Sequence, residues 1–258
     1  MTKKDALATT AEVSLAAMDP EQALDLEEIA AELGDDIASL GMTLFTRVKM
    51  PAGGGRAYEI DDADDPDDPE VTSSIEGVVV AHHSVNAYWA KSLDDGGDAA
   101  PDCASKDGRS GYGDRGIDGD TGGPYPCAEC PLNEFGSSES GGKACKNMKH
   151  LFVLRAGDVI PLLVVLPPAS IKAWQVYLTK SVLLKRRKAH GIITRIGLEK
   201  AKNAGGIEYS RATFAFGGAL TPEQSEFCKQ MGESLLPIVT EHVPALLTEA
   251  APSEQGPF

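Results

Sequence analysis

Short runs of β-branched and aromatic residues, and stretches in which apolar and polar residues alternate, indicate strands through the middle of the chain. Ile75–Ala81 and Val85–Trp89 are such runs, and they predict one bent strand or two short ones. A Gly-rich turn over 203–206 joins the last two expected strands, and Ala156–Asp158 separates an earlier pair. The other expected strands are Thr43–Met50, Ala57–Ile60, Leu151–Arg155, Val159–Leu166, Ile192–Leu198 and Tyr209–Phe216.

The stretch before Ser74 is expected to hold a hairpin followed by an acidic loop. Thr43–Met50 and Ala57–Ile60 flank Pro51–Arg56, whose three consecutive glycines suit a flexible hairpin tip. Asp61–Glu70 then carries seven acids in ten residues. Because its like charges and prolines cannot bury a core, this segment is predicted to be a disordered acidic loop.

Three segments carry the signals of helices. Asp19–Gly34 has a capping Asp, Pro at the first helical position, an apolar stripe at helical spacing and a terminal Gly. Ser170–Lys188 has Ser at its N-cap, Trp174 in its apolar stripe, and a Lys-Arg-Arg-Lys cluster in its last turn, where cations suit the helix dipole. Thr221–Gln224 is a capping box that opens a last helix, which Pro237 should kink or end.

From Ser74 the elements follow the order strand, insertion, strand, strand, helix, strand, strand. This is the order of an OB-fold, a small barrel that binds single strands and oligosaccharides. We therefore expect a mainly β, α+β protein, with an OB-fold-like five-stranded barrel over 43–218 and a zinc ribbon at 91–149 inserted between its first two strands. Residues 1–42 are expected to form an acidic N-terminal segment with one helix, and residues 219–258 a C-terminal helix and tail.

The composition, with 42% hydrophobic and 24% charged residues, excludes collagen, coiled coil and wholesale disorder. No apolar run approaches the roughly 18 residues that cross a bilayer, and the first residues lack the basic-then-apolar layout of a signal peptide. We expect a cytoplasmic protein with no membrane partner.

The net charge of −15 is unevenly distributed along the chain. Residues 1–80 carry nineteen acids and five bases, whereas residues 143–211 carry fourteen bases and three acids. A basic region inside an acidic chain indicates polyanion binding, because cations displace the counterions of a phosphate backbone. The alternative is a solvated basic surface that neutralises the acidic N-terminal part of the same molecule.

Four of the five cysteines lie in a Gly-rich segment that cannot form a hydrophobic core, with the spacing C-x23-C-x2-C-x14-C. They are Cys103, Cys127, Cys130 and Cys145. The close pair can wrap a metal as a zinc knuckle and the outer two complete a tetrahedron, so we expect one structural Zn2+. The alternatives are redox-active or unligated thiols, or a catalytic zinc with His150 or Glu129 as its base.

The sequence holds no recognisable catalytic set. It lacks a nucleophile elbow, an HExxH pair, a phosphate loop and a dinucleotide fingerprint. The adjacent His82 and His83 should point to opposite faces of a strand, as a polar, hydrogen-bonded pair rather than as joint metal ligands. We therefore expect a protein that is not an enzyme.

Aromatic and basic residues interleave, as single-strand binders require, because cations track phosphates while rings stack on bases. Trp174, Phe214 and Phe216 lie on apolar faces and are better explained as core residues. The expected nucleic-acid-binding residues are Tyr88, Trp89, Lys146, Lys149, Arg155, Lys185, Arg186, Arg187, Lys188, Arg195, Tyr209 and Arg211.

The blocks Cys103–Gly108, Cys127–Asn133 and Gly142–Lys146 carry a resemblance to known proteins. A strand, a four-cysteine insertion and then the rest of a barrel resembles the zinc-containing DNA-binding domain of the replication protein A large subunit. Together with Leu166–Ser170 and Asn203–Ser210, the blocks resemble a single-stranded-DNA-binding-like family of phages and integrated mobile elements, over about residues 43–216. The resemblance implies a role in DNA metabolism and, for a phage-encoded protein, the host cytoplasm.

The terminal Pro257 and Phe258, after Glu249 and Glu254, are similar to the acidic tail by which bacterial single-stranded-DNA-binding proteins recruit partners. Our leading hypothesis is a protein of phage or mobile-element replication or recombination that binds single-stranded DNA, or RNA, and recruits replication and recombination proteins through this tail. The alternatives are a protein-interaction adaptor with a structural zinc ribbon, and a zinc-dependent nucleic-acid enzyme.

Overall fold

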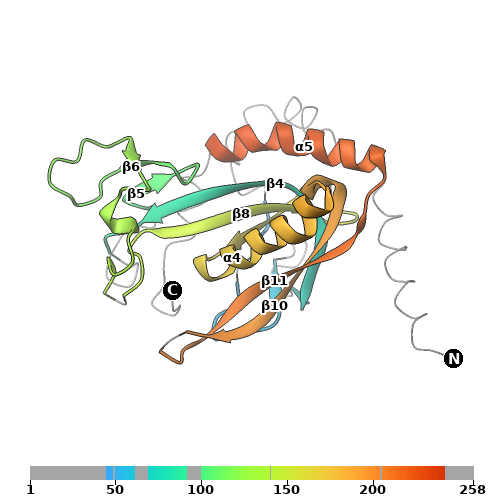
Figure 1. The fold of residues 1–258 in the computed structure, drawn as a ribbon, viewed down its shortest axis with the longest axis horizontal. Coiled ribbons are helices and arrows are strands. Elements are labelled where there is room, and N and C mark those ends of the chain that lie inside the picture. The colour runs from blue at the N-terminus through green and yellow to red at the C-terminus, as the bar shows by residue number, and fades with distance from the viewer. Residues whose placement is uncertain are drawn as a thin grey trace.

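The computed structural model describes residues 45–48, 50–61, 69–91, 100–139, 141–203 and 205–241. These residues form a mixed α+β structure, mostly strands with two α-helices, which confirms the expected class (Figure 1). The predicted helix Asp19–Gly34, most of the acidic loop 61–70, and the tail residues Pro257 and Phe258 lie outside the described residues. No helix within the described ranges is long and apolar enough to span a membrane.

The sheet is organised around β4 (Ser74–Tyr88), a strand of 15 residues. One edge of β4 pairs with β8 (Lys146–Leu154), which is followed by β9 (Leu162–Leu166) and, parallel to β9, by β1 (Arg47–Val48). A register shift after Val79 lets β4 bend without breaking. The segment predicted as one bent strand or two short ones is therefore one strand.

The other edge of β4 pairs with two different strands, one at each of its ends (Figure 1). Its N-terminal end pairs with β10 (Ile192–Lys202), which forms a long antiparallel pair with β11 (Glu208–Ala219). Its C-terminal end pairs with β5 (Cys103–Ser105), which continues into β6 (Ser110–Gly113) and β7 (Tyr125–Pro126). The sheet therefore branches at β4, and the expected closed barrel does not form among the described strands.

Two helices cover opposite faces of the central strands (Figure 1). α5 (Pro222–Glu241) buries Met231 and Leu235 in a core with one face of β4 and β8. A methyl group at Gly232 would lie 2.0 Å from the carbonyl oxygen of Val80, so α5 rests directly on the backbone of β4. This close approach fixes the position of α5 on the sheet.

α4 (Pro168–Tyr177) packs on the opposite face. Its Trp174 and Tyr177 join Leu151 of β8 and Ile196 of β10 in a second buried core, which confirms the prediction for Trp174. Ser170 is not the N-cap of this helix, because Pro167 occupies that position and the buried Ser170 hydroxyl accepts a hydrogen bond from the Ala212 N–H at 3.0 Å. α4 is thereby fixed to both β8 and the β10–β11 pair.

The start of α5 confirms the predicted capping box. The backbone N–H of Gln224 donates to Thr221 Oγ1 at 3.3 Å, and the N–H of Thr221 donates to Gln224 Oε1 at 3.1 Å. The helix does not end at Pro237 but continues to Glu241. The fully buried Val239 keeps the turn after the proline on the core.

The predicted hairpin over 43–60 is wrong. β1 pairs with β9, and β2 (Tyr58–Ile60) pairs with β3 (Glu70–Thr72) as a separate small sheet. These pairings leave Val48 and Tyr58 with no exposed surface, whereas a hairpin held only by its Gly-rich tip would expose one face of each strand.

Candidate metal centre and nucleic-acid interface

The cysteine-containing insertion, residues 100–145, lies at the C-terminal end of β4 and contains β5, β6 and β7 (Figure 1). Backbone hydrogen bonds hold its loops together: the N–H of Cys127 donates to Arg109 O at 2.7 Å, and that of Cys145 donates to Leu132 O at 2.8 Å. These bonds place cysteines that are far apart in the sequence beside one another.

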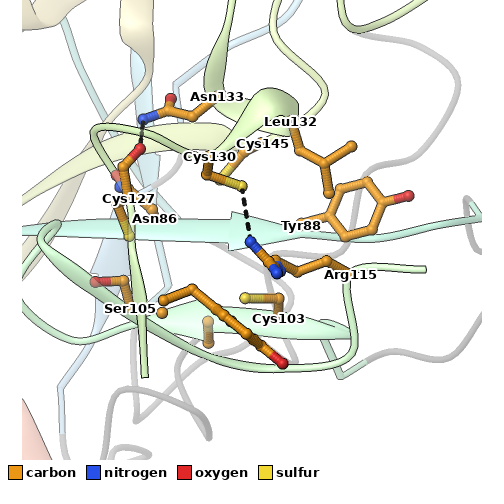
Figure 2. Close-up of a pocket in the computed structure, with 13 residues that line it drawn as sticks. Asn86, Tyr88, Cys103, Ser105, Arg115, Cys127, Cys130, Leu132, Asn133 and Cys145 are labelled. Carbon is orange, nitrogen blue, oxygen red and sulfur yellow. Dashed lines mark hydrogen bonds between the residues drawn. The ribbon is translucent and has the colours of Figure 1, made fainter. Parts of the chain in front are cut away.

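All four predicted metal ligands line one cavity (Figure 2). The cavity has a volume of about 20 Å3, which is room for one water-sized sphere. A methyl group at Gly111 would lie 3.2 Å from the Cys103 sulfur and 3.6 Å from the Cys127 sulfur, so these two thiols converge on one point. All of the cysteines are free thiols.

Four sulfur donors around so small a space suit a tetrahedral zinc ion, because magnesium and calcium prefer oxygen ligands. Among the described residues, however, no three His, Cys, Asp or Glu side chains are arranged as the ligands of a metal ion. Burial, together with the neighbouring cysteines, raises the pKa of Cys145 to about 12 and the pKa of Cys103 to about 11. Thiolates gathered without a cation repel one another, and a divalent metal would relieve that repulsion.

Arg115 borders the cavity and was not singled out from the sequence. Its Nη1 lies 4.0 Å from the sulfur of Cys130, and its guanidinium lies 3.5 Å from the ring centre of Tyr125 (Figure 2). Its Nε lies 3.1 and 3.2 Å from the two carboxylate oxygens of Asp120, and this hydrogen bond holds the pKa of that carboxyl below its usual range. A fixed cation beside four thiols would offset part of the negative charge of a thiolate site. An arginine in a Gly-rich loop matches no motif, so its position beside the cavity could not be deduced from the sequence pattern.

A chain of side-chain hydrogen bonds joins the insertion to β4 and β8. Asn147 of β8 donates to Asn86 Oδ1 of β4 at 2.9 Å. The Lys143 ammonium donates to Asn147 Oδ1 at 3.3 Å and to Asn133 Oδ1 at 3.1 Å. Asn133 in turn donates to the carbonyl oxygen of Cys127 at 2.7 Å (Figure 2). This network positions the Cys127–Cys130 knuckle relative to the sheet.

The core histidines lie away from the cysteine cavity. His82 and His83 point to opposite faces of β4, as predicted: the His82 ring lies 5.5 Å from Trp174 and the His83 ring 5.1 Å from His150. The predicted hydrogen bonding is found in part: His83 Nδ1 lies 3.1 Å from Lys106 O, whereas His82 Nδ1 and His83 Nε2 have no hydrogen-bond partner among the described residues. Burial lowers the pKa of His82 to about 4. Neither His150 nor Glu129, the candidate bases for a catalytic zinc, lines the cavity.

Three of the predicted nucleic-acid-binding cations form a first group, which lies against carboxylates. Its arginine pairs are Arg195 with Glu76, Arg211 with Glu199 at 2.8 Å, and Arg155 with both Glu70 and Asp158 at 2.7 Å. Lys200 and Lys202 of β10 both pair with Glu208 of β11. The three arginine charges are neutralised within the chain, whereas Glu208 offsets one of the two charges of Lys200 and Lys202, which were not among the predicted residues.

The second group lies on the segment after α4, which we call the basic turn (residues 178–188). The α-helix ends at Tyr177 rather than reaching Lys188 as predicted, and it is followed by a π-helical turn and a short 3-10 helix. Within the part of the chain that the structure describes, none of the five cations of the basic turn has a carboxylate within 4.0 Å. They are Lys180, Lys185, Arg186, Arg187 and Lys188.

The basic turn closes as a Schellman motif, in which two hydrogen bonds end a helix around a left-handed residue. Arg186 is the left-handed residue, with φ of 53°. Its N–H donates to Leu183 O, and the N–H of Arg187 donates to Val182 O, both at 2.9 Å. Glycine usually occupies this position, because a residue with a side chain is strained at positive φ. The backbone of Arg186 is therefore strained.

Arg187 differs from the other cations of the basic turn. Its guanidinium lies 3.8 Å from the ring centre of Phe216 on β11, and its Nη1 donates to Ser181 O at 3.2 Å. Phe216, which was expected in the core, is exposed. The basic turn therefore contacts β11 through Arg187 and Phe216, and both side chains are at least partly exposed.

The remaining predicted residues do not gather on one surface. Lys146 and Lys149 of β8 are half-buried, and burial lowers the pKa of both. Trp89 is only 9% exposed and packs in the core, while Tyr88 lines the cysteine cavity. Tyr209 is half-buried on β11.

The insertion exposes an aromatic residue that the sequence analysis missed. Phe135 is 84% exposed, and the Lys143 ammonium lies 5.3 Å from its ring centre. A single aromatic in a Gly-rich loop shows no periodicity, so its exposure could not be deduced from the pattern.

Comparisons with models of protein families, with curated proteins and with solved structures found no match for this chain.

Proposed function

We propose that the protein is a non-enzymatic single-stranded-DNA-binding protein of phage or mobile-element replication or recombination. The observation that carries the proposal is the basic turn, where Lys180, Lys185, Arg186 and Lys188 have no carboxylate partner in the described structure. They form a fixed positive surface on a chain whose net charge is −15. A localised surface of this kind suits phosphates, because contacts to a polyanion release its condensed counterions.

A base-stacking surface lies beside these cations. Phe216 is exposed next to the basic turn, and Arg187 covers part of its ring. Rings and guanidinium planes both stack on unpaired bases without selecting a sequence. The combination favours an unpaired strand over a simple inorganic anion.

The order of elements also supports the proposal. β4, the insertion, β8, β9, α4, β10 and β11 follow the order expected of an OB-fold. We propose that the core is an opened version of this fold, with a zinc ribbon between its first two strands and the basic turn at the end of its helix.

In this proposal Cys103, Cys127, Cys130 and Cys145 hold one structural zinc ion, which would supply a crosslink in a segment that lacks a hydrophobic core. Metal analysis of the purified protein should find about one zinc per chain. Cys130→Ser should lose the metal and lower the melting temperature. Cys228→Ala is the matched control, because this thiol belongs to α5 and is buried in the core away from the cavity. Absence of zinc from the wild-type protein, or equal zinc in Cys130→Ser, would contradict the metal site.

The experiment that tests the function is a fluorescence anisotropy titration of labelled oligothymidylate and of a duplex at several salt concentrations. We expect tighter binding to the single strand. Four phosphate contacts should make log affinity fall with log salt at a slope of about −3. The proposal fails if neither oligonucleotide binds at low salt, or if binding does not depend on salt.

The exposed Phe135 favours a second function, that of an adaptor which recruits a protein through the insertion. A highly exposed aromatic side chain can act as an interface anchor, because aromatic residues are enriched among the residues that carry binding energy. We propose that recruitment of replication proteins uses Phe135, or the tail residues Pro257 and Phe258. Phe135→Ser should then reduce capture of a partner by the full chain without changing affinity for oligothymidylate.

A further inference from the structure

Two leucines at the tip of the basic turn are exposed, although large apolar side chains usually lie inside. Leu183 is 66% exposed and Leu184 is 72% exposed. They are consecutive residues of the 3-10 helix Leu183–Lys185, so the uncompensated cations Lys185 and Arg186 follow them directly. The preceding Val182 is buried in the core with α4.

The exposure of these leucines is fixed by the local backbone. The Schellman hydrogen bonds tie Arg186 to Leu183 and Arg187 to Val182, and the burial of Val182 anchors the first residue of the motif. Leu183 and Leu184 therefore cannot turn inward without breaking the helix terminus. An apolar pair held outward on a rigid element is already arranged for contact with a partner.

The charges around the leucines identify the kind of partner. Two copies of the protein meeting at this turn would bring like charges together, which disfavours a symmetric self-interface. A membrane-surface helix needs an apolar stripe along several turns, whereas this tip offers two adjacent leucines. An unpaired strand presents phosphates and apolar base faces side by side, which matches cations and leucines side by side. In a duplex the base faces are stacked and hidden from such contacts.

We infer that Leu183 and Leu184 contact the bases of an unpaired strand whose phosphates lie against the cations of the basic turn. The inference rests on the proposed function, and it assigns within that function the residues that discriminate a single strand from a duplex. Apolar side chains reach the base faces of a duplex only by unstacking them, which costs free energy at each step, and an unpaired strand does not require this cost.

The test compares the double variant Leu183→Ser/Leu184→Ser with the wild-type full chain. The matched control is Ile207→Ser, since Ile207 is also a 52% exposed aliphatic residue in a turn, but its cationic neighbours Lys200 and Lys202 are paired with Glu208. Affinity for oligothymidylate and for a duplex is measured over a range of salt, and thermal melting confirms that each variant is folded.

The double variant should bind oligothymidylate about tenfold more weakly, as expected for partial burial of two leucine side chains. The slope against log salt should not change, because apolar contacts release no counterions. Duplex affinity should stay the same, so the preference for a single strand falls. Ile207→Ser should match the wild-type protein in every measurement.

Unchanged affinity of the double variant for oligothymidylate would overturn the inference while leaving the proposed function intact. A change in sedimentation-determined oligomeric state without a change in oligonucleotide affinity would also overturn it and assign the leucines to contact between copies. If the wild-type chain does not bind oligothymidylate, the proposed function itself fails, and the two failures are thereby distinguished.

Discussion

The basic turn and the β10–β11 pair carry similar positive side chains but differ in the acids beside them. On the strands, Arg195 and Arg211 each lie against a glutamate, so the net charge of each pair is zero. On the basic turn, Lys185 and Arg186 have no such neighbour within the described residues. The count of cations in a segment therefore says little about where a polyanion binds.

The reason is that exposed ion pairs are weak but still cancel the local field. Such a pair contributes only about 0–1 kcal/mol to folding, yet its carboxylate repels an approaching phosphate as strongly as its cation attracts it. An uncompensated cation attracts phosphate without that opposition. The comparison therefore predicts that the basic turn dominates nucleic-acid affinity.

The largest effect is expected from two charge-matched double variants. If each cation makes one phosphate contact, Lys185→Ala/Arg186→Ala should flatten the slope of log affinity against log salt concentration by about 1.4. Binding to oligothymidylate should then weaken roughly 50-fold at about 0.05 M salt. Arg195→Ala/Arg211→Ala removes the same formal charge and should change the slope little. Anisotropy titrations of both variants test this prediction. Equal losses in the two variants would show that net charge, and not the position of the uncompensated cations, controls binding.

A smaller gain is expected when the strand arginines are released from their partners. Glu76→Gln/Glu199→Gln should leave Arg195 and Arg211 uncompensated and steepen the salt slope by up to about 0.7 for each arginine that reaches a phosphate. Affinity should rise several-fold at low salt, with little loss of stability. Glu129→Gln/Glu223→Gln is a control with the same charge change, because neither glutamate pairs with a cation among the described residues. If both double variants bind equally, the carboxylate partners are not what keeps the strand arginines from binding.

The smallest effect concerns the strained residue of the basic turn. Arg186→Gly should raise the free energy of unfolding by about 0.5 kcal/mol, because glycine adopts a positive φ without the clash of a side chain. It should also weaken binding by removing one cation. Urea denaturation measures the first effect. Lys185→Gly is the control and should lower stability, since Lys185 lies in the 3-10 helix. Destabilisation by Arg186→Gly would mean that the arginine side chain, and not the backbone, stabilises the turn.

Local features of the fold were predictable from the sequence, whereas the pairing of distant segments was not. The capping box of α5 and the existence of the adjacent strands β10 and β11 depend on neighbouring residues, and both are confirmed, although the predicted alternation fails at the exposed Phe216. The hairpin was wrong because β1 pairs with the distant strand β9, and β2 pairs instead with β3, the next strand along the chain. The described strands form no closed barrel, because the second edge of β4 pairs with β10 at one end and with β5 at the other. No local sequence pattern predicts this division.

The candidate site shows the same division. The four cysteines singled out by their spacing line one cavity, and the metal that they were expected to bind stays a prediction. The pairing of Arg195 with Glu76 joins residues 119 positions apart, so the sequence could not separate neutralised from uncompensated cations. The exposure of the two leucines could not be predicted, because the expected helix over 170–188 ends at Tyr177. The segment after it closes in a Schellman motif whose left-handed residue is an arginine, where glycine is usual.

The most direct test of the central claim is a lysine-acetylation footprint read by mass spectrometry, with and without saturating oligothymidylate. A bound strand should shield the lysines that it covers. We predict that Lys185 and Lys188 lose most of their reactivity in the complex, while Lys200 and Lys202 keep theirs. Protection of Lys200 and Lys202, with unchanged labelling of Lys185 and Lys188, would place the strand on β10–β11 and contradict the assignment to the basic turn.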